Sequence, residues 1–239
     1  MKVVERHIID KNDPRWAIID EAAFLAKNLY NATNYLMRQH FFKTDKYLSL
    51  SALYHMVRAN YPTDYQALPA KVSNQVIKHV LRDWSSFTQA QKAYQATPNK
   101  FTGKPKPPKY KGKRSKARRN GRSALFYEMG AISKVFWLNE GLAKPSRLDV
   151  TVKTRVAYED LCEMRIVPQH SCYVIEIIYE RQESEAIASP YVAGVDIGLN
   201  NLAAVASNKP GVWPLLVNGR PLKSVNQYYN KRKAQLQSQ

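Results

Sequence analysis

The sequence has few cysteines, no long apolar run and, in two of its segments, no acidic residue. Two cysteines among 239 residues are too few for a disulfide-stapled scaffold. No run approaches the roughly 20 apolar residues that a membrane-spanning helix needs, and the first residues, MKVVERHIID, lack the apolar core of a signal peptide. We therefore expect a cytoplasmic protein without a membrane partner.

Acidic residues are missing from segments 100–122 and 197–239. The first segment carries 11 Lys and Arg side chains and the second carries 6, and together they account for almost all of the net charge of +18. Like charges at this density repel one another and destabilise a compact state unless a polyanion neutralises them. Nucleic acid is the natural partner, because each neutralised phosphate releases condensed counterions. A basic localisation or solubility tail is the alternative.

Residues 99–122, which include the first basic segment, read NKFTGKPKPPKYKGKRSKARRNGR, and their prolines and glycines exclude a regular helix and predict an extended loop. Proline stiffens such a loop, so less conformational entropy is lost when it lies along a phosphate backbone. We assign nucleic-acid contacts, including base stacking by the one tyrosine, to Lys104, Lys106, Lys109, Tyr110, Lys111, Lys113, Arg114, Arg118 and Arg119. In the second basic segment the same role is assigned to Arg220, Lys223, Lys231 and Arg232.

Residues 13–98 have the apolar spacing of helices. Asp13-Pro14 predicts a helix start, Ser49 opens a second helix, and a third begins near Pro69. In the first helix the predicted apolar face is Ile18, Ala22, Leu25, Leu29 and Leu36. The aromatic residues of this region have helical spacing, which favours the core over base stacking: Trp16, Tyr30, Tyr35, Trp84 and Tyr94. Three amphipathic helices in succession predict a small helical bundle.

After Ser123 the helical spacing of apolar residues ends, and short runs typical of strands follow. The predicted strands are 124–127, 134–138, 148–153, 162–167 and 173–179. The last two, joined by Pro168-Gln169-His170-Ser171, form a hairpin. Short antiparallel strands in succession predict a small barrel or sandwich. Cys162, His170 and Cys172 lie in or near this hairpin, but their spacing matches no zinc ligand set.

Asp196 is the most informative single residue. It lies near the end of the run YVAGVDI, whose otherwise apolar character predicts a central strand buried on both faces. A buried carboxylate needs a partner, a hydrogen bond or a metal, because an isolated buried charge is very costly. Strands 202–206 and 212–217 and a helix from Arg220 follow, which is the opening of an α/β domain. A simple cap at the strand-to-turn transition is the alternative role for Asp196.

The string GVDIGLNNLAAVAS around Asp196, with GRPLKSVNQYYNKRKAQLQS after it, resembles the first RuvC motif and following helix of the TnpB (OrfB) insertion-sequence proteins. These are RNA-guided DNA nucleases encoded by transposable elements, similar to the ancestors of type V CRISPR effectors. Upstream, LYNATNYLMRQ and GKPKPPKYKGK resemble the family's helical recognition part and wedge-type barrel. The resemblance covers essentially the whole chain.

The resemblance implies an α+β multidomain fold. A helical recognition bundle is inserted in a small, wedge-like β-barrel, and an incomplete RNase H-like (RuvC) α/β domain follows. The expected parts are the first barrel strand (1–12), the helical recognition part (13–98), the basic loop (99–122), the remaining barrel strands (123–185) and the first part of the RuvC-like domain (190–239).

The family's reaction is metal-dependent DNA cleavage, in which carboxylates from three separated motifs hold two divalent metal ions. Asp196 corresponds to the first carboxylate and is expected to bind Mg²⁺ in an incomplete site. No acid follows it, and the cysteine pairs of the family's zinc ribbon are missing from this chain. We therefore expect a C-terminally truncated protein that binds guide RNA and DNA, takes no small-molecule substrate and does not cleave alone. The alternatives are a non-catalytic nucleic-acid-binding module or repressor derived from the family, and a basic structural protein with incidental similarity.

Overall fold

The structure is a computed structural model that describes residues 1–112, 121–183, 188–198 and 200–238. The chain divides into two compact units, Met1–Glu183 and Ser184–Gln239. Within the described ranges, none of the helices is both long and apolar enough to cross a membrane.

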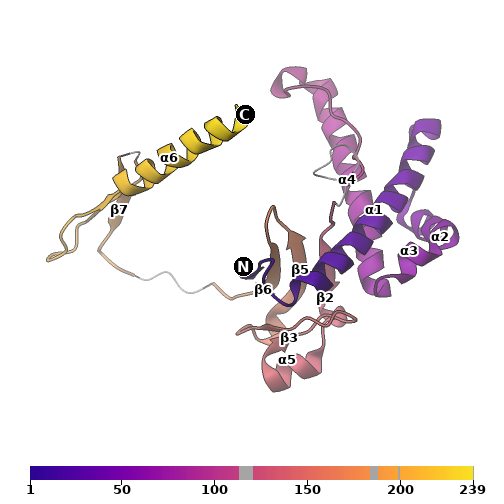
Figure 1. The fold of residues 1–239 in the computed structure, drawn as a ribbon, viewed down its shortest axis with the longest axis horizontal. Coiled ribbons are helices and arrows are strands. Elements are labelled where there is room, and N and C mark those ends of the chain that lie inside the picture. Colours follow the sequence, from indigo (N-terminus) through magenta and orange to yellow (C-terminus); the bar gives the residue numbers. More distant parts are fainter. Residues whose placement is uncertain (113–120, 184–187, 199, 239) are drawn as a thin grey trace. The chain divides into compact units, whose positions relative to one another are not determined.

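The first unit contains helices between two strands of one sheet (Figure 1). After β1 (Lys2–Ile9) come the helices α1 (Trp16–Thr44), α2 (Leu50–Asn60), α3 (Pro62–Gln66) and α4 (Ala70–Ala96). Ser49 is confirmed as the cap of α2, since its hydroxyl accepts a hydrogen bond of 3.2 Å from the Ala52 backbone N–H. A short 3₁₀ turn at Pro98–Lys100 ends the helical part.

The predicted apolar face of α1 is confirmed at Ala22, Leu29 and Leu36, which are buried, and is wrong at Ile18. Ile18 is 38% exposed, whereas Ile19, Ala23 and Ala26 are fully buried. Small alanines at these positions let the backbone of α1 approach its neighbours closely. Tyr30 and Trp84 are buried as expected, but Tyr35 is 45% exposed, so its assignment to the core is wrong.

The main sheet of the first unit is antiparallel and has the strand order β1-β6-β5-β2. Its other strands are β2 (Leu125–Glu128), β5 (Leu161–Pro168) and β6 (Tyr173–Glu180). The predicted β5–β6 hairpin is confirmed, and α4 packs on β2. A separate two-stranded sheet is formed by β3 (Leu142–Ala143) and β4 (Val152–Lys153).

The predicted closed barrel is not formed by the residues that the structure describes. Strands β1 and β2 are the two edges of a four-stranded sheet and do not pair with each other. Four strands at the usual inter-strand twist leave a sheet open, because small barrels need at least about five. The observed fold is therefore a mixed α+β arrangement with several antiparallel sheets.

Residues 134–138, which we predicted as a strand, lie in a helix, α5 (Lys134–Glu140). Gly141 ends this helix in the left-handed conformation at φ 64°, and its N–H bonds back to the Trp137 carbonyl at 3.1 Å. Only glycine adopts that conformation without a steric cost. Trp137 is the one buried residue of α5, and its indole N–H donates to the Val156 carbonyl at 2.8 Å.

Asp20 of α1 connects three parts of the first unit. Its carboxylate accepts hydrogen bonds from Arg122 Nε (2.8 Å) and Nη2 (2.5 Å), at the end of the basic segment, and from the Tyr173 hydroxyl of β6 (2.6 Å). The bonds from Arg122, followed by the bond from Tyr173, hold the pKa of Asp20 below its ordinary 3.8 against the opposing effect of burial. Asp20 therefore stabilises the fold at neutral pH.

We expect Asp20→Asn to lower the free energy of unfolding by about 2 kcal/mol at pH 7. Because the folded pKa of Asp20 is lowered, this contribution is present above pH 3.8 and is lost as the pH falls through the lower folded value. Urea denaturation at pH 7 and at pH 3 should therefore show a difference from the parent that shrinks in acid. Asp149→Asn, at a carboxylate that is 88% exposed, is the control and should change little.

The second unit is a three-stranded antiparallel sheet of order β7-β8-β9 followed by a helix. Its elements are β7 (Ala193–Asp196), β8 (Asn201–Ser207), β9 (Leu215–Asn218) and α6 (Arg220–Gln237). We predicted β7 as a central strand buried on both faces, whereas it is an edge strand with all four residues exposed. Among its described residues this unit has no second layer that would cover the sheet, which explains the exposure.

Candidate functional site

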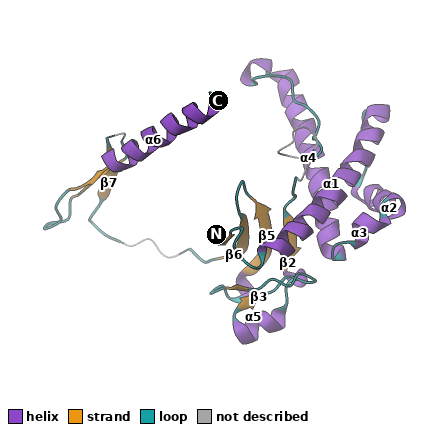
Figure 2. Cartoon of the chain, in the orientation of Figure 1, coloured by secondary structure: helices purple, strands orange, loops and turns teal. Residues whose placement is uncertain are grey.

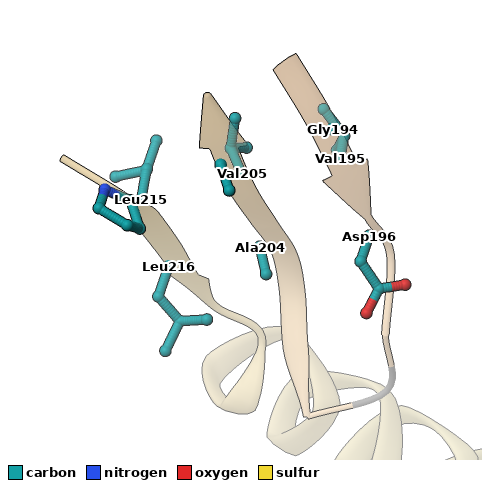
Figure 3. A pocket seen from close by; sticks show the side chains of 9 residues that line it. Gly194, Val195, Asp196, Ala204, Val205, Leu215 and Leu216 are labelled. Atoms are coloured by element: carbon teal, nitrogen blue, oxygen red, sulfur yellow. The ribbon is translucent and has the colours of Figure 1, made fainter. Parts of the chain in front are cut away.

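Asp196 ends β7 and pairs with Ala204 of β8. Figure 3 shows its carboxylate beside Ala204 and Leu216, on the opposite face from Val195 and Val205. This alternation follows from the strand period of two. The side chain is exposed, so the carboxylate keeps its solvation and is free of the desolvation cost of a buried charge.

The turn after Asp196 is held by backbone and amide groups. The N–H of Gly198 donates to the Asn201 carbonyl at 3.1 Å, and the N–H of Gly219 donates to the Asn200 carbonyl at 3.1 Å. Lys223 Nζ of α6 donates to the Asn200 side-chain oxygen at 3.1 Å. A Cβ on Gly219 would lie 2.9 Å from the Leu202 backbone nitrogen, so only glycine permits this approach of α6 to the turn.

Asp196 shares a cavity of ≈ 290 Å³ with Gly198, Asn200, Asn201 and Ala204. Carboxylate and amide oxygens are the donors that Mg²⁺ prefers. A two-metal centre needs several carboxylates, however, and no group of three or more His, Cys, Asp or Glu side chains comes together anywhere in the described ranges. Asp196 by itself does not fit a resident two-metal site.

Lys104, Lys106 and Lys109 lie in a stretch without helix or strand, as predicted, and all three are exposed. Figure 2 shows the segment that follows α4 as loop. The exposed ammonium groups can therefore meet phosphates without rearrangement. The other expected contacts of this segment, Lys113, Arg114, Arg118 and Arg119, lie outside the described residues.

Three polar residues of α1 hold this segment in place. Asn31 makes two hydrogen bonds to the backbone of Lys111: its amide nitrogen donates to the carbonyl (2.9 Å), and its oxygen accepts from the N–H (2.8 Å). Asn34 Nδ2 and Arg38 Nη1 donate to the Pro108 carbonyl at 3.2 and 2.9 Å. Spacings of three and four residues place these side chains on one side of α1. In the sequence, the signal of this anchoring is the spacing of the two asparagines and the arginine within LYNATNYLMRQ.

Lys111 and Tyr110 contact the protein itself. The Lys111 ammonium lies 4.4 Å from the centre of the Tyr30 ring, and burial lowers its pKa while Asp83 opposes that shift. Tyr110 lies beside Arg38, whose guanidinium carbon is 5.5 Å from its ring centre, and burial raises the pKa of its hydroxyl. Both side chains therefore help to seat the segment on α1.

Within the basic segment, the backbones of Gly112 and Gly121 lie close together. A Cβ on Gly121 would lie 3.0 Å from the Cα and the nitrogen of Gly112. The two points at which the described chain enters and leaves residues 113–120 are therefore in contact. Ser123 N–H then bonds to the Ala23 carbonyl at 3.0 Å, which returns the chain to α1.

The cations expected in the second unit lie on α6. At about 100° per residue, Arg220, Lys223 and Lys231 fall within one sector of the helix, and Arg232 lies about 140° from the centre of that sector. All four are exposed, while Lys223 also bonds to Asn200. Arg220 and Lys223 therefore lie near the turn that follows Asp196.

The family model of the probable transposases called OrfB_IS605 matches residues 176–239. A search of curated proteins found no match. Among solved structures, a chain of the cryo-EM structure of the Cas12f1-sgRNA-target DNA complex is similar at 12% identity, with a TM-score of 0.33 over 99% of this chain. This chain spans 62% of the length of that chain, and so low a TM-score supports no inference about function. The family model thus confirms the TnpB/OrfB resemblance over residues 176–239, from β6 through α6, whereas the resemblance of LYNATNYLMRQ and GKPKPPKYKGK lies outside the matched residues and stays a prediction.

Proposed function

We propose that this chain is the nucleic-acid-binding part of a transposon-encoded, TnpB-like protein, which binds guide RNA and DNA. In this proposal Asp196 is the first catalytic carboxylate of an RNase H-like (RuvC) nuclease domain. The observation that carries it is the position of Asp196 at the end of β7, beside the Asn200 turn and within the segment that matches the family. The exposed lysines at 104, 106 and 109 support nucleic acid as the partner.

The parts of the chain receive the following roles in this proposal. Residues 1–12 and 123–185 form the wedge-like sheet, 13–98 the helical recognition part, 99–122 the basic loop and 190–239 the first part of the nuclease domain. The element order supports an inserted bundle, because α1 to α4 lie between β1 and β2, which belong to the same sheet. The helical bundle is thus joined to the sheet at both ends.

Binding in this proposal depends on phosphate contacts. Lys104, Lys106 and Lys109 neutralise the backbone, while base pairing with the guide reads the DNA sequence. The family's reaction requires divalent metal, with Mg²⁺ as the expected ion and Asp196 as one ligand. Since the described residues bring no further carboxylates to Asp196, we assign no cleavage step to this chain.

A second candidate is a non-catalytic binding module or repressor derived from the same family. The cavity beside Asp196 is lined by the uncharged residues Gly198, Asn200, Asn201 and Ala204, which suits a role in shaping the turn. This module would keep the phosphate contacts and the guide pairing, but Asp196 would only shape the turn after β7. The two candidates therefore predict the same binding and differ in the role of Asp196.

Binding and cleavage of nucleic acid by the full chain test the proposal. Fluorescence anisotropy with labelled RNA and DNA should show an affinity that falls linearly on a logarithmic salt scale. Affinity that does not change with salt would contradict the proposal. With guide RNA, matched DNA and Mg²⁺, no products are expected from this chain alone, because the described residues bring no further carboxylates to Asp196. Products that form with the parent and disappear in Asp196→Ala would contradict the non-catalytic module. That variant should keep the parent's binding, since the carboxylate contributes no positive charge.

A further inference from the structure

A stripe of exposed aromatic side chains with an arginine between them runs along α1, next to the basic segment. Its members are Tyr35, Arg38 and Phe42, which fall within about 60° of one another around the helix axis. Tyr35 is 45% exposed and Phe42 is 62% exposed. Exposed aromatic side chains on a helix that otherwise packs against the core are candidates for a binding surface.

The stripe continues into the basic segment through Arg38. The guanidinium carbon of Arg38 lies 5.1 Å from the centre of the Phe42 ring and 5.5 Å from that of Tyr110, so the arginine connects the two rings. Arg38 also holds the Pro108 carbonyl at 2.9 Å, which fixes this part of the segment against the helix. Lys109, between these anchored residues, is exposed.

The charge around the stripe is positive. From Tyr35 to its end at Thr44, α1 carries Arg38 and Lys43 and no acidic residue. Lys104, Lys106 and Lys109 add three exposed cations from the neighbouring segment. A surface that offers exposed rings among cations fits a ligand that has both flat bases and phosphates.

We propose that Tyr35 and Phe42 are base-stacking residues for an unpaired stretch of RNA, with Lys109 on its phosphates. Tyr35 and Phe42 are seven residues apart, about 10 Å along the helix, which leaves room for separate bases on each ring. RNA is the occupant because stacking needs bases that are not paired, and RNA presents such bases in loops and single-stranded ends, whereas DNA is mostly duplex. This inference rests on the proposed function only in that nucleic acid is the partner.

The test measures binding of the full chain to a twelve-nucleotide RNA of alternating cytidine and adenosine, which forms no stable pairs. Tyr35→Ala and Phe42→Ala should each weaken binding about fivefold or more, and the double variant about 25-fold. Tyr35→Phe keeps the ring and should bind as the parent does. Leu138→Ala, which removes an apolar side chain that is 59% exposed on α5, is the matched control and should have no effect.

An abasic oligomer of the same length separates stacking from phosphate contact. The parent should prefer the RNA with bases, and the double variant should lose this preference while its affinity for the abasic oligomer and its salt dependence stay unchanged. Equal binding of the double variant and the parent to the RNA would overturn the inference. So would an equal loss of affinity for the abasic oligomer.

The DNA oligomer of the same sequence tests the choice of RNA. Binding of that DNA as tightly as the RNA would overturn RNA as the occupant. Failure of this inference is distinct from failure of the proposed function: the former leaves nucleic-acid binding intact but insensitive to the two rings, and the latter removes binding of every oligomer. Unchanged thermal unfolding of the variants, whose side chains are exposed, confirms that they fold.

Discussion

Replacing Lys104, Lys106 and Lys109 together with alanine is expected to weaken binding of single-stranded nucleic acid about 100-fold at 0.1 M salt. Each phosphate contact adds about 0.7 to the slope of the logarithm of affinity against the logarithm of salt concentration, which is about fivefold per contact at this salt concentration. The three ammonium groups are exposed, so their removal leaves the hydrophobic core as it is. Fluorescence anisotropy between 0.05 and 0.5 M salt should show a slope smaller by about 2.

A charge-matched variant distinguishes local contact from net charge. Lys11, Lys153 and Arg155 are also exposed, and their replacement with alanine removes the same three charges from the first unit. This variant should lose much less affinity and keep most of the salt slope. Equal losses in the two triple variants would show that only the overall charge of the protein matters.

Trp84→Ala is expected to lower the free energy of unfolding by about 3 to 5 kcal/mol, and so to unfold much of the protein at 37 °C. Trp84 of α4 is fully buried, with its ring centre 4.9 Å from that of Phe41 and 5.8 Å from that of Phe87. Its indole N–H donates to the Asn34 oxygen at 2.8 Å. Alanine would leave a cavity and an unpaired buried acceptor. Chemical denaturation followed by circular dichroism measures the loss.

The same variant has a second expected effect, on the basic segment. Asn34 bonds both to Trp84 and to the Pro108 carbonyl, so the tryptophan orients the amide that holds the segment. Trp84→Phe keeps a six-membered aromatic ring in the core but removes the N–H and part of the indole, and should cost about 1 to 2 kcal/mol. In Trp84→Phe, hydrogen exchange at the Lys111 N–H, which bonds to the Asn31 oxygen in the same anchored segment, should become faster while the helices remain protected. Unchanged exchange there would argue against this coupling.

The sequence predicted the long helices and the β5–β6 hairpin because each follows a clear period over many residues. For residues 134–138 the sequence predicts a strand because the run is short and apolar, and the period of apolar residues cannot separate a strand from a helical turn at that length. The signal that decides the matter is Gly141, which ends α5 in the left-handed conformation. Helix caps therefore carry more information than composition in such short segments.

For the candidate site, the sequence identified Asp196 and the cationic segment but not how that segment is held. Asn31, Asn34 and Arg38 contact residues more than 60 positions away in the chain, and spacing along one helix does not reveal such partners. The contact of Lys111 with the Tyr30 ring could not be predicted either, because it depends on how the segment packs on α1. Tyr35 was assigned to the core because helical spacing tells which side of a helix a residue occupies, but not where its buried face ends.

The pairing of β1 with β6 brings the two ends of the first unit together. Lys2 pairs with Glu180, and the Arg181 N–H bonds to the Met1 carbonyl at 2.9 Å. Domains whose ends are adjacent tolerate circular permutation. A peptide linker from Arg181 to Met1, with new ends at the exposed turn after α1, around Lys46, would keep every strand neighbour in place. We therefore expect a circular permutant of the first unit to keep the same fold.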